Sequence, residues 1–170
     1  MSIFKQFIKS LFSPKHIAAF RMQGIGKTIN YLFFLALLMC VPMIVYMFLY
    51  VISGSESAKG IVEAELPVLA LKGDIMPVVF VTYYLLVSFI LFVKVSIFGG
   101  TGLLIARILK KRAEYRHTFR MAAYAVTLPA IITIILELAG WTLPSGYLLD
   151  WLITGAMLYA AVRYLPGAPK

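Results

Sequence analysis

Two long stretches of the chain are almost free of charge. No residue between Thr28 and Glu56 is charged, and between Ile75 and Ala106 the one charged residue is Lys94. A helix of about 20 apolar residues crosses the hydrocarbon core of a bilayer, and its backbone groups pair within the helix because lipid offers them no partner. These stretches therefore predict an integral membrane protein of the all-α class.

The apolar pattern as a whole predicts four transmembrane helices. Their approximate ranges are residues 29–52, 75–108, 121–140 and 147–165. The second would be about 50 Å long as one helix, against a hydrocarbon core of ~30 Å, so we expect it to tilt, protrude or break. Pro42 is placed to kink the first span because proline lacks a backbone N–H. Gly99, Gly100 and Gly102 form the natural break or close-packing point of the second.

Residues 1–27 carry the pattern of short amphipathic helices. Apolar residues recur there at helical spacing between polar ones, namely Ile3, Phe4, Phe7, Ile8 and Leu11. Ser13 and Pro14 have the residue types of an N-cap and a first helical position, which opens a second short helix. We expect both helices to lie at the membrane interface. The alternative is that they pack on the protein's own cytosolic face.

Charge orients the predicted spans and argues against nucleic acid as a partner. The chain is 62% hydrophobic with a formal net charge of +9, but its cations lie beside the apolar runs, where they act as topology signals and meet anionic lipid headgroups. Five Lys and Arg residues fall in 1–27 and six in the basic loop 107–120, against two in the connector 53–74. The positive-inside rule therefore predicts a cytosolic N-terminus and a cytosolic C-terminus.

Lys94 is the candidate functional residue placed within a span. A lysine at a helix centre costs about 2.5–3.5 kcal/mol on insertion scales. We expect it to snorkel to the headgroups or to make a structural contact, and the alternative is a polar route through the membrane. Glu137 differs from it in depth by on the order of 15 Å, so a salt bridge between them is not expected. Glu137 and Asp150 flank the outer turn, where acids bind a cation or a basic segment or are simply solvated.

Other candidate chemistry is weak. Residues 24–28 imitate the end of a phosphate-binding loop, but Arg21 stands where that motif needs a glycine. Glu114 and His117 share a helical face, yet carboxylate metal sites need several such ligands. The single cysteine, Cys40, excludes an intramolecular disulfide. No serine has a plausible histidine base. We therefore expect no catalytic residue, no metal and no cofactor, and a protein that is not an enzyme.

Two stretches resemble a known family. Ser13 to Thr28 leads straight into the first span, and Tyr115 to Ala125 is followed by Thr127-Leu128-Pro129. They resemble the start, and the cytosolic loop with the third span, of the bacterial membrane family called domain of unknown function 1189 (DUF1189). The resemblance implies the bacterial cytoplasmic membrane, a distant relationship to Yip-type multispan proteins, and a link of some members to maltodextrin utilisation. It carries over no catalytic residue.

The connector distinguishes this chain from typical members of that family. They carry a sizeable extracytoplasmic domain between the first two spans, where this chain has only residues 53–74. The resemblance therefore implies a shortened member without that domain.

We interpret the chain as a non-enzymatic membrane accessory or scaffold protein that assists a transporter or an envelope process. Its expected partners are anionic lipids and either another membrane protein or further copies of itself. The predicted lipid or partner surface consists of Lys110, Lys111, Arg112, Arg116 and Arg120. The alternative is a subunit of a small oligomeric transporter or channel, with Lys94 and the glycine cluster on a polar route.

Overall fold

Helices make up the regular structure of the described residues. The computed structural model describes residues 3–53, 76–140 and 146–167, in which an isolated β-bridge between Lys111 and Gly167 accompanies the helices. Residues 54–74 of the predicted connector and the outer turn with Trp141 and Pro144 lie outside the described residues. The all-α fold class predicted from the sequence is confirmed for the described part of the chain.

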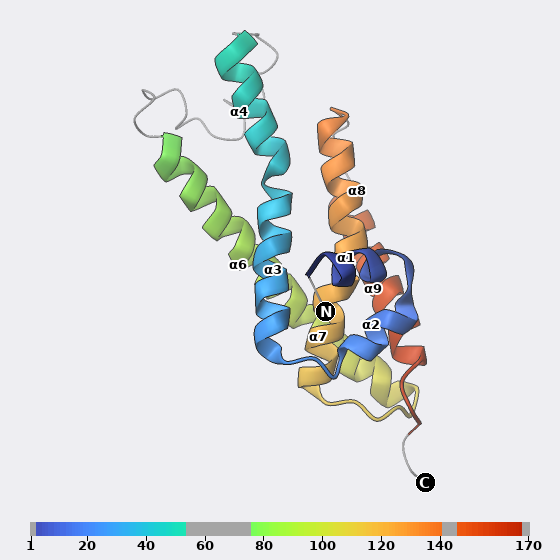
Figure 1. The fold of residues 1–170 in the computed structure, drawn as a ribbon. Helices are drawn as coiled ribbons and strands as arrows, with labels where there is room; N and C mark the ends of the chain where they lie inside the picture. The colour runs from blue at the N-terminus through green and yellow to red at the C-terminus, as the bar shows by residue number, and fades with distance from the viewer. Residues whose placement is uncertain (1–2, 54–75, 141–145, 168–170) are drawn as a thin grey trace.

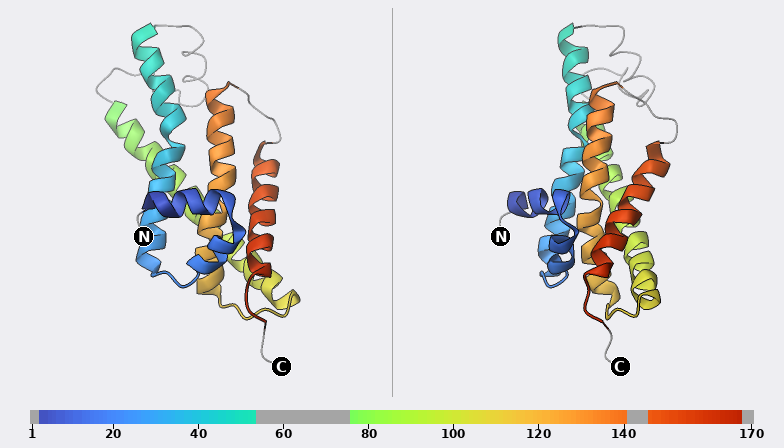
Figure 2. Two further views of the ribbon diagram at one scale, coloured as in Figure 1. Left: turned by 45° about the vertical axis from the view of Figure 1, so that its right-hand side comes forward. Right: turned by 90° about the vertical axis from the view of Figure 1, so that its right-hand side faces the viewer.

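The helices form an upright bundle with two short helices against it (Figure 1). One column consists of α3 (Ile25–Met39) and α4 (Val41–Ser53), and a second of α7 (Tyr115–Ala125) and α8 (Thr127–Leu138). The tilted helix α6 (Met76–Ile108) and the helix α9 (Gly146–Arg163) complete the bundle. The first helices, α1 (Ile3–Phe12) and α2 (Pro14–Phe20), pack across it, and α1 lies nearly perpendicular to the columns (Figure 2).

Three described stretches are long and apolar enough to cross a membrane. They are Ile25–Leu49, Pro77–Ile108 and Tyr115–Leu138, and they correspond to the first three predicted spans. Helix α9, at the place of the fourth, is not among them because it is not apolar enough on average; its 18 residues include Asp150 and Arg163. The sequence therefore predicted one span more than the described helices provide by length and composition.

The basic loop is shorter than the predicted 107–120. Helix α6 runs to Ile108 and α7 begins at Tyr115, so Arg116 and Arg120 stand on α7 instead of in a loop. The carbonyl of Glu114 starts that helix early by accepting the N–H groups of His117 and Thr118. The interhelical loop thus comprises residues 109–114.

Helix α6 is continuous through its glycines, so they do not break the helix. Their role is the other one considered, close packing against neighbouring helices. A Cβ atom at Gly99 would lie 3.2 Å from the Cα atom of Phe119, and one at Gly102 would lie 3.2 Å from Leu158 and 3.3 Å from Thr118. At Gly100 no described atom lies within 4 Å of that position. Gly99 and Gly102 therefore let α7 and α9 approach α6 closely, as small residues do between membrane helices.

Two interruptions divide the long columns, and each comes just before a proline. Helix α3 ends next to Cys40, two residues before Pro42, and α7 ends next to Val126, three residues before Pro129. A proline has no N–H to donate to the carbonyl four residues earlier, so the regular ladder cannot continue unchanged. The N–H groups of Cys40 and Val126 still bond to carbonyls of the preceding turn, which keeps each column nearly straight.

The packing of α1 departs from the amphipathic pattern of its sequence. The apolar Ile8 is 58% exposed, whereas the polar Gln6 and Ser10 are fully buried. Phe7 packs edge-on against Phe34 of α3, with ring centroids 6.1 Å apart. Because α1 also contacts α7 and α8, it directs part of its polar side into the bundle and part of its apolar side outward.

We predict that Gly102→Leu destabilises the protein by about 1–3 kcal/mol, the usual cost of overpacking, because its side chain would collide with Leu158 and Thr118. Gly100→Ala is the matched control, and it should stabilise α6 by up to about 1 kcal/mol through helix propensity. Thermal unfolding in mild detergent measures both. Equal effects of the two substitutions would contradict the close-packing role.

Candidate functional site

An ion pair inside the bundle joins α6 to α9. Lys94 Nζ donates a hydrogen bond to Asp150 Oδ2, and the two side chains are only 12% and 19% exposed. The backbone carbonyl of Asp150 in turn accepts a 2.7 Å hydrogen bond from the hydroxyl of Thr154. Charged residues within apolar helices usually face the bundle and pair with one another. Here each charge compensates the other within the same chain.

The pair belongs to a longer contact between two helices that run in the same direction (Figure 2). Below it, the ring of Phe98 lies 5.3 Å from that of Trp151, and Gly102 faces Leu158. The steps from Lys94 to Gly102 and from Asp150 to Leu158 have the same length along their helices, as parallel helices of equal rise require. The ion pair and the glycine contact therefore fix one register.

This pairing corrects the expected place of Asp150 and supplies the partner of Lys94. Asp150 was expected at the outer turn. Lys94 was expected to snorkel to the headgroups or to make a structural contact, but Asp150 was not foreseen as its partner. Helix α9 has 18 residues against the 24 of Tyr115–Leu138, and it begins lower than α8 ends (Figure 2). Asp150 is therefore level with Lys94. Lys94 lies 13 residues above Arg107, about 20 Å along α6.

Glu137 is placed apart from that pair. It lies near the end of α8, is exposed, and its backbone carbonyl accepts a hydrogen bond from the hydroxyl of Tyr46 in α4. Val79 of α6 packs against Tyr46 as well. These contacts join α4, α6 and α8 at the end of the bundle that is opposite to the basic loop (Figure 1).

A buried polar cluster holds α1 to the bundle. We define it by six residues, Gln6, Ser10, Gln23, Tyr31, Tyr124 and Thr127. The hydroxyl of Tyr31 lies 2.6 Å from that of Thr127 and 3.1 Å from that of Ser10, and Ser10 donates to Thr127 at 3.3 Å. These three side chains are fully buried. Buried hydroxyls need such partners because unpaired ones cost about 1–3 kcal/mol.

The other half of the buried polar cluster is centred on Tyr124. Its hydroxyl lies 3.0 Å from Gln6 Oε1 and 3.0 Å from Gln23 Oε1. Its ring packs between those of Phe20 and Tyr31, with centroid distances of 4.6 and 4.5 Å. One side chain of α7 therefore contacts α1, α2 and α3 together with the segment that joins α2 to α3.

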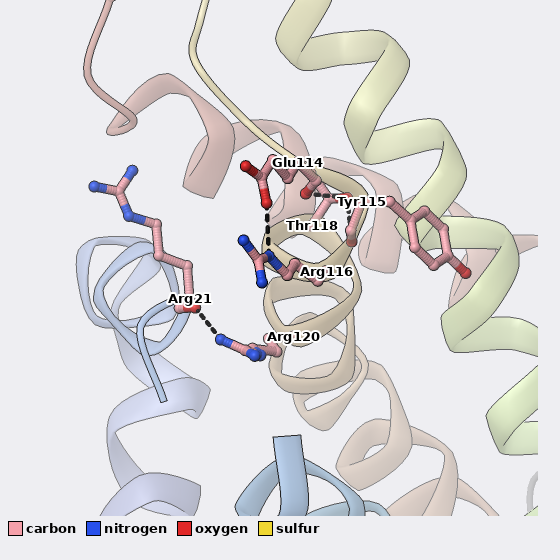
Figure 3. A network of polar contacts seen from close by, with 6 residues as sticks. All are labelled: Arg21, Glu114, Tyr115, Arg116, Thr118 and Arg120. Atoms are coloured by element: carbon pink, nitrogen blue, oxygen red, sulfur yellow. Dashed lines mark hydrogen bonds and ion pairs between the residues drawn. The ribbon is translucent and has the colours of Figure 1, made fainter. Parts of the chain in front are cut away.

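The basic candidates gather where α7 begins (Figure 3). Arg116 Nε donates to Glu114 Oε2 at 2.6 Å in an exposed pair, and this hydrogen bond, with the charge of Arg116, holds the pKa of Glu114 below its usual value. Arg120 is half-buried and donates to the backbone carbonyl of Arg21 at 2.8 Å. Arg120 therefore connects α7 to the end of α2, and of the two arginines Arg116 is the one at the surface.

The remaining basic candidates end α6 and contact the C-terminal segment. Lys110 has a φ of 51°, and the N–H groups of Lys110 and Lys111 return to the carbonyls of Arg107 and Ala106. This is the Schellman arrangement that usually carries glycine. Arg112 then donates its N–H to the carbonyl of Pro166 at 3.2 Å. Lys110 and Arg112 are exposed, whereas Lys111 is half-buried beside the β-bridge.

The described residues place no group of three or more His, Cys, Asp or Glu side chains where a metal ion would bind. Cys40 is buried between α3 and α4. The arrangement presents a basic surface at one end of the bundle. Inside the bundle, the ion pair of Lys94 with Asp150 and the buried polar cluster connect the helices.

Fold and site together define an α-helical protein with three candidate membrane spans and a basic end. The chain belongs to the family described as Protein of unknown function (DUF1189), whose profile matches residues 4–74 and 73–162. The first matched segment includes the connector, which the resemblance drawn from the sequence did not cover. Comparison with curated proteins and with solved structures gave no match.

Sequence reasoning missed the buried polar cluster and the partner of Lys94. Tyr31 in the first predicted span, together with Tyr124 and Thr127 in the third, places hydroxyl groups within apolar runs. These residues were a signal for the cluster. The partner of Lys94 was hidden because depth was counted from the ends of each apolar run, and α9 starts at a different height from α8.

We predict that Asp150→Asn destabilises the protein by about 3–5 kcal/mol because it leaves Lys94 buried without its counter-charge. The double variant with Lys94→Met and Asp150→Leu removes both charges and should unfold within about 1 kcal/mol of the wild type. Thermal unfolding in mild detergent compares them. If the double variant is as unstable as the single one, the two charges stabilise the fold by more than cancelling each other's cost of burial.

Tyr124→Phe should lower the free energy of unfolding by about 1–3 kcal/mol, since it removes the hydroxyl near both glutamine amides in a buried place. It should also speed cleavage by trypsin after Lys9, because α1 is held in part through Gln6. Tyr84→Phe is the control, as its exposed hydroxyl makes only a 3.4 Å bond to the Phe33 carbonyl. Unchanged cleavage in Tyr124→Phe would contradict this anchoring.

Proposed function

We propose that the protein is a non-enzymatic accessory or scaffold protein of the bacterial cytoplasmic membrane that assists a transporter or an envelope process. The observation that carries the proposal is the concentration of exposed cations at one end of an apolar bundle. Arg107, Lys110, Arg112 and Arg116 are all exposed there, around the loop between α6 and α7. A surface of this kind suits an acidic face of a protein partner or anionic lipid.

The topology that we propose has four spans, with α9 as the fourth and both termini in the cytosol. The charge distribution supports it, because the described cations other than Lys94 lie in α1, between the start of α2 and the start of α3, in the loop 109–114, on α7, or at the ends of α6 and α9 beside that loop. Cytosolic segments carry such an excess of lysine and arginine. Helix α1, perpendicular to the columns with Ile8 and Lys9 exposed, then lies at the cytosolic interface.

The contacts of Lys94 support a structural role for this residue more than a polar route. Its ammonium group is engaged by Asp150, and Gly99 and Gly102 are covered by α7 and α9. A transport path along these residues would have to separate an ion pair and open two close helix contacts. The accessory role requires no such opening, so we favour it over a transporter or channel subunit.

The proposal predicts that affinity purification from native membranes in mild detergent, with crosslinking, retains a second protein in stoichiometric amount. Reversal of Lys110, Lys111 and Arg112 to glutamate should lower its recovery by roughly tenfold or more, as lost and inverted charge contacts do. Lys9→Glu, on α1, is the control and should retain the partner.

Recovery of a homo-oligomer alone would contradict the accessory role and favour the oligomeric transporter. Full retention of the partner by the triple variant would remove the basic loop from the interface.

A further inference from the structure

An open hollow lies at the C-terminal end of α9. It is not part of the partner surface proposed above around the loop between α6 and α7. It has a volume of about 350 Å³ and is lined by Tyr159, Ala160, Arg163 and Tyr164. Tyr159 and Tyr164 are 46% and 53% exposed, although large aromatic side chains usually bury most of their surface.

One cation lines this hollow and a second, from another helix, lies beside it. Arg163 is exposed in the last turn of α9, and within the described residues no hydrogen bond or ion pair engages its guanidinium. Lys15 of α2 lies beside the hollow, with Nζ 5.5 Å from the ring centroid of Tyr164, which is one of the lining residues. The acids of the described residues lie elsewhere, with Glu114 and Asp150 paired to other cations and Glu137 at the opposite end. The hollow is therefore positively charged and suited to an anion.

An apolar stripe leads away from the hollow along α9. Leu148, Leu152, Ala156, Tyr159 and Arg163 follow one another at helical spacing, and all five are exposed. Leu148 and Leu152 are each 68% exposed. The stripe is aliphatic first, then aromatic at Tyr159, and finally cationic at Arg163, which is the order in which a membrane passes from acyl chains to headgroups.

We propose that this face of α9 is a binding site for one anionic glycerophospholipid. The guanidinium of Arg163 binds the phosphate through paired N–H donors, and Lys15 adds a second positive charge. The hydroxyls of Tyr159 and Tyr164 donate to headgroup oxygens, while an acyl chain lies along Leu152 and Leu148. This inference rests on the proposed cytosolic orientation of the basic end.

The test is native mass spectrometry of the detergent-purified full-length protein, titrated with phosphatidylglycerol or with phosphatidylcholine. We expect the wild type to retain phosphatidylglycerol in preference to phosphatidylcholine. Arg163→Gln and Lys15→Gln should each weaken phosphatidylglycerol binding by roughly tenfold or more, as loss of a charged hydrogen bond does. Arg163→Lys keeps the charge and should retain most of the binding. Lys9→Gln, a matched loss of one exposed cation on α1, should bind as the wild type does.

Three outcomes would overturn the site. Equal binding by the wild type and Arg163→Gln would exclude the guanidinium, and an equal loss in Lys9→Gln would reduce the effect to overall charge. Competition by soluble glycerol phosphate at the same concentration as the lipid would show that the apolar stripe contributes nothing. The partner experiment on Lys110, Lys111 and Arg112 is independent, so retained lipid binding without any protein partner would reject the accessory role and leave this site standing.

Discussion

The pairing of Lys94 with Asp150 is the interaction on which the arrangement of the helices depends. An ion pair within an apolar bundle tolerates little displacement, because moving either helix along its axis would separate two charges in surroundings that solvate neither. It therefore fixes the height of α9 against α6. The close contact of Gly102 with Leu158 and the position of Arg163 at the basic end both follow from that height.

Polar groups inside the apolar bundle also need partners from the protein itself, and this need explains the buried polar cluster. Where a column is interrupted at Val126, the neighbouring residues Tyr124 and Thr127 carry hydroxyls into the interior, and the side chains that meet them come from α1, α3 and the segment before α3. In a low-dielectric interior such a network is stable only when its members are satisfied. The N-terminal helix thus completes the bundle instead of only lying beside it.

Part of this structure could be predicted from the sequence, and part could not. The apolar runs identified three membrane-compatible helices because lipid leaves the backbone few alternatives, and Ser13-Pro14 marked the start of α2. The height of α9 could not be predicted, since it depends on the tertiary partner of Asp150. The burial of Gln6 and Ser10 was hidden for the same reason, because their partners are distant in sequence. The cluster of cations was visible in the sequence, but the different roles of its arginines were not. Tertiary contacts show that Arg116 is exposed at the surface, whereas Arg120 donates a hydrogen bond to the carbonyl of Arg21.

The parallel arrangement of α6 and α9 has a consequence for biogenesis. Asp150 follows Lys94 by 56 residues, which at about 5–20 residues per second corresponds to roughly 3–11 s of translation. In the proposed topology α6 enters the bilayer during that interval with an uncompensated lysine, at a cost of about 2.5–3.5 kcal/mol if it lies near the centre. Until α9 has been synthesised, Lys94 is therefore without its counter-charge, and the many apolar side chains of α6 have to offset that cost.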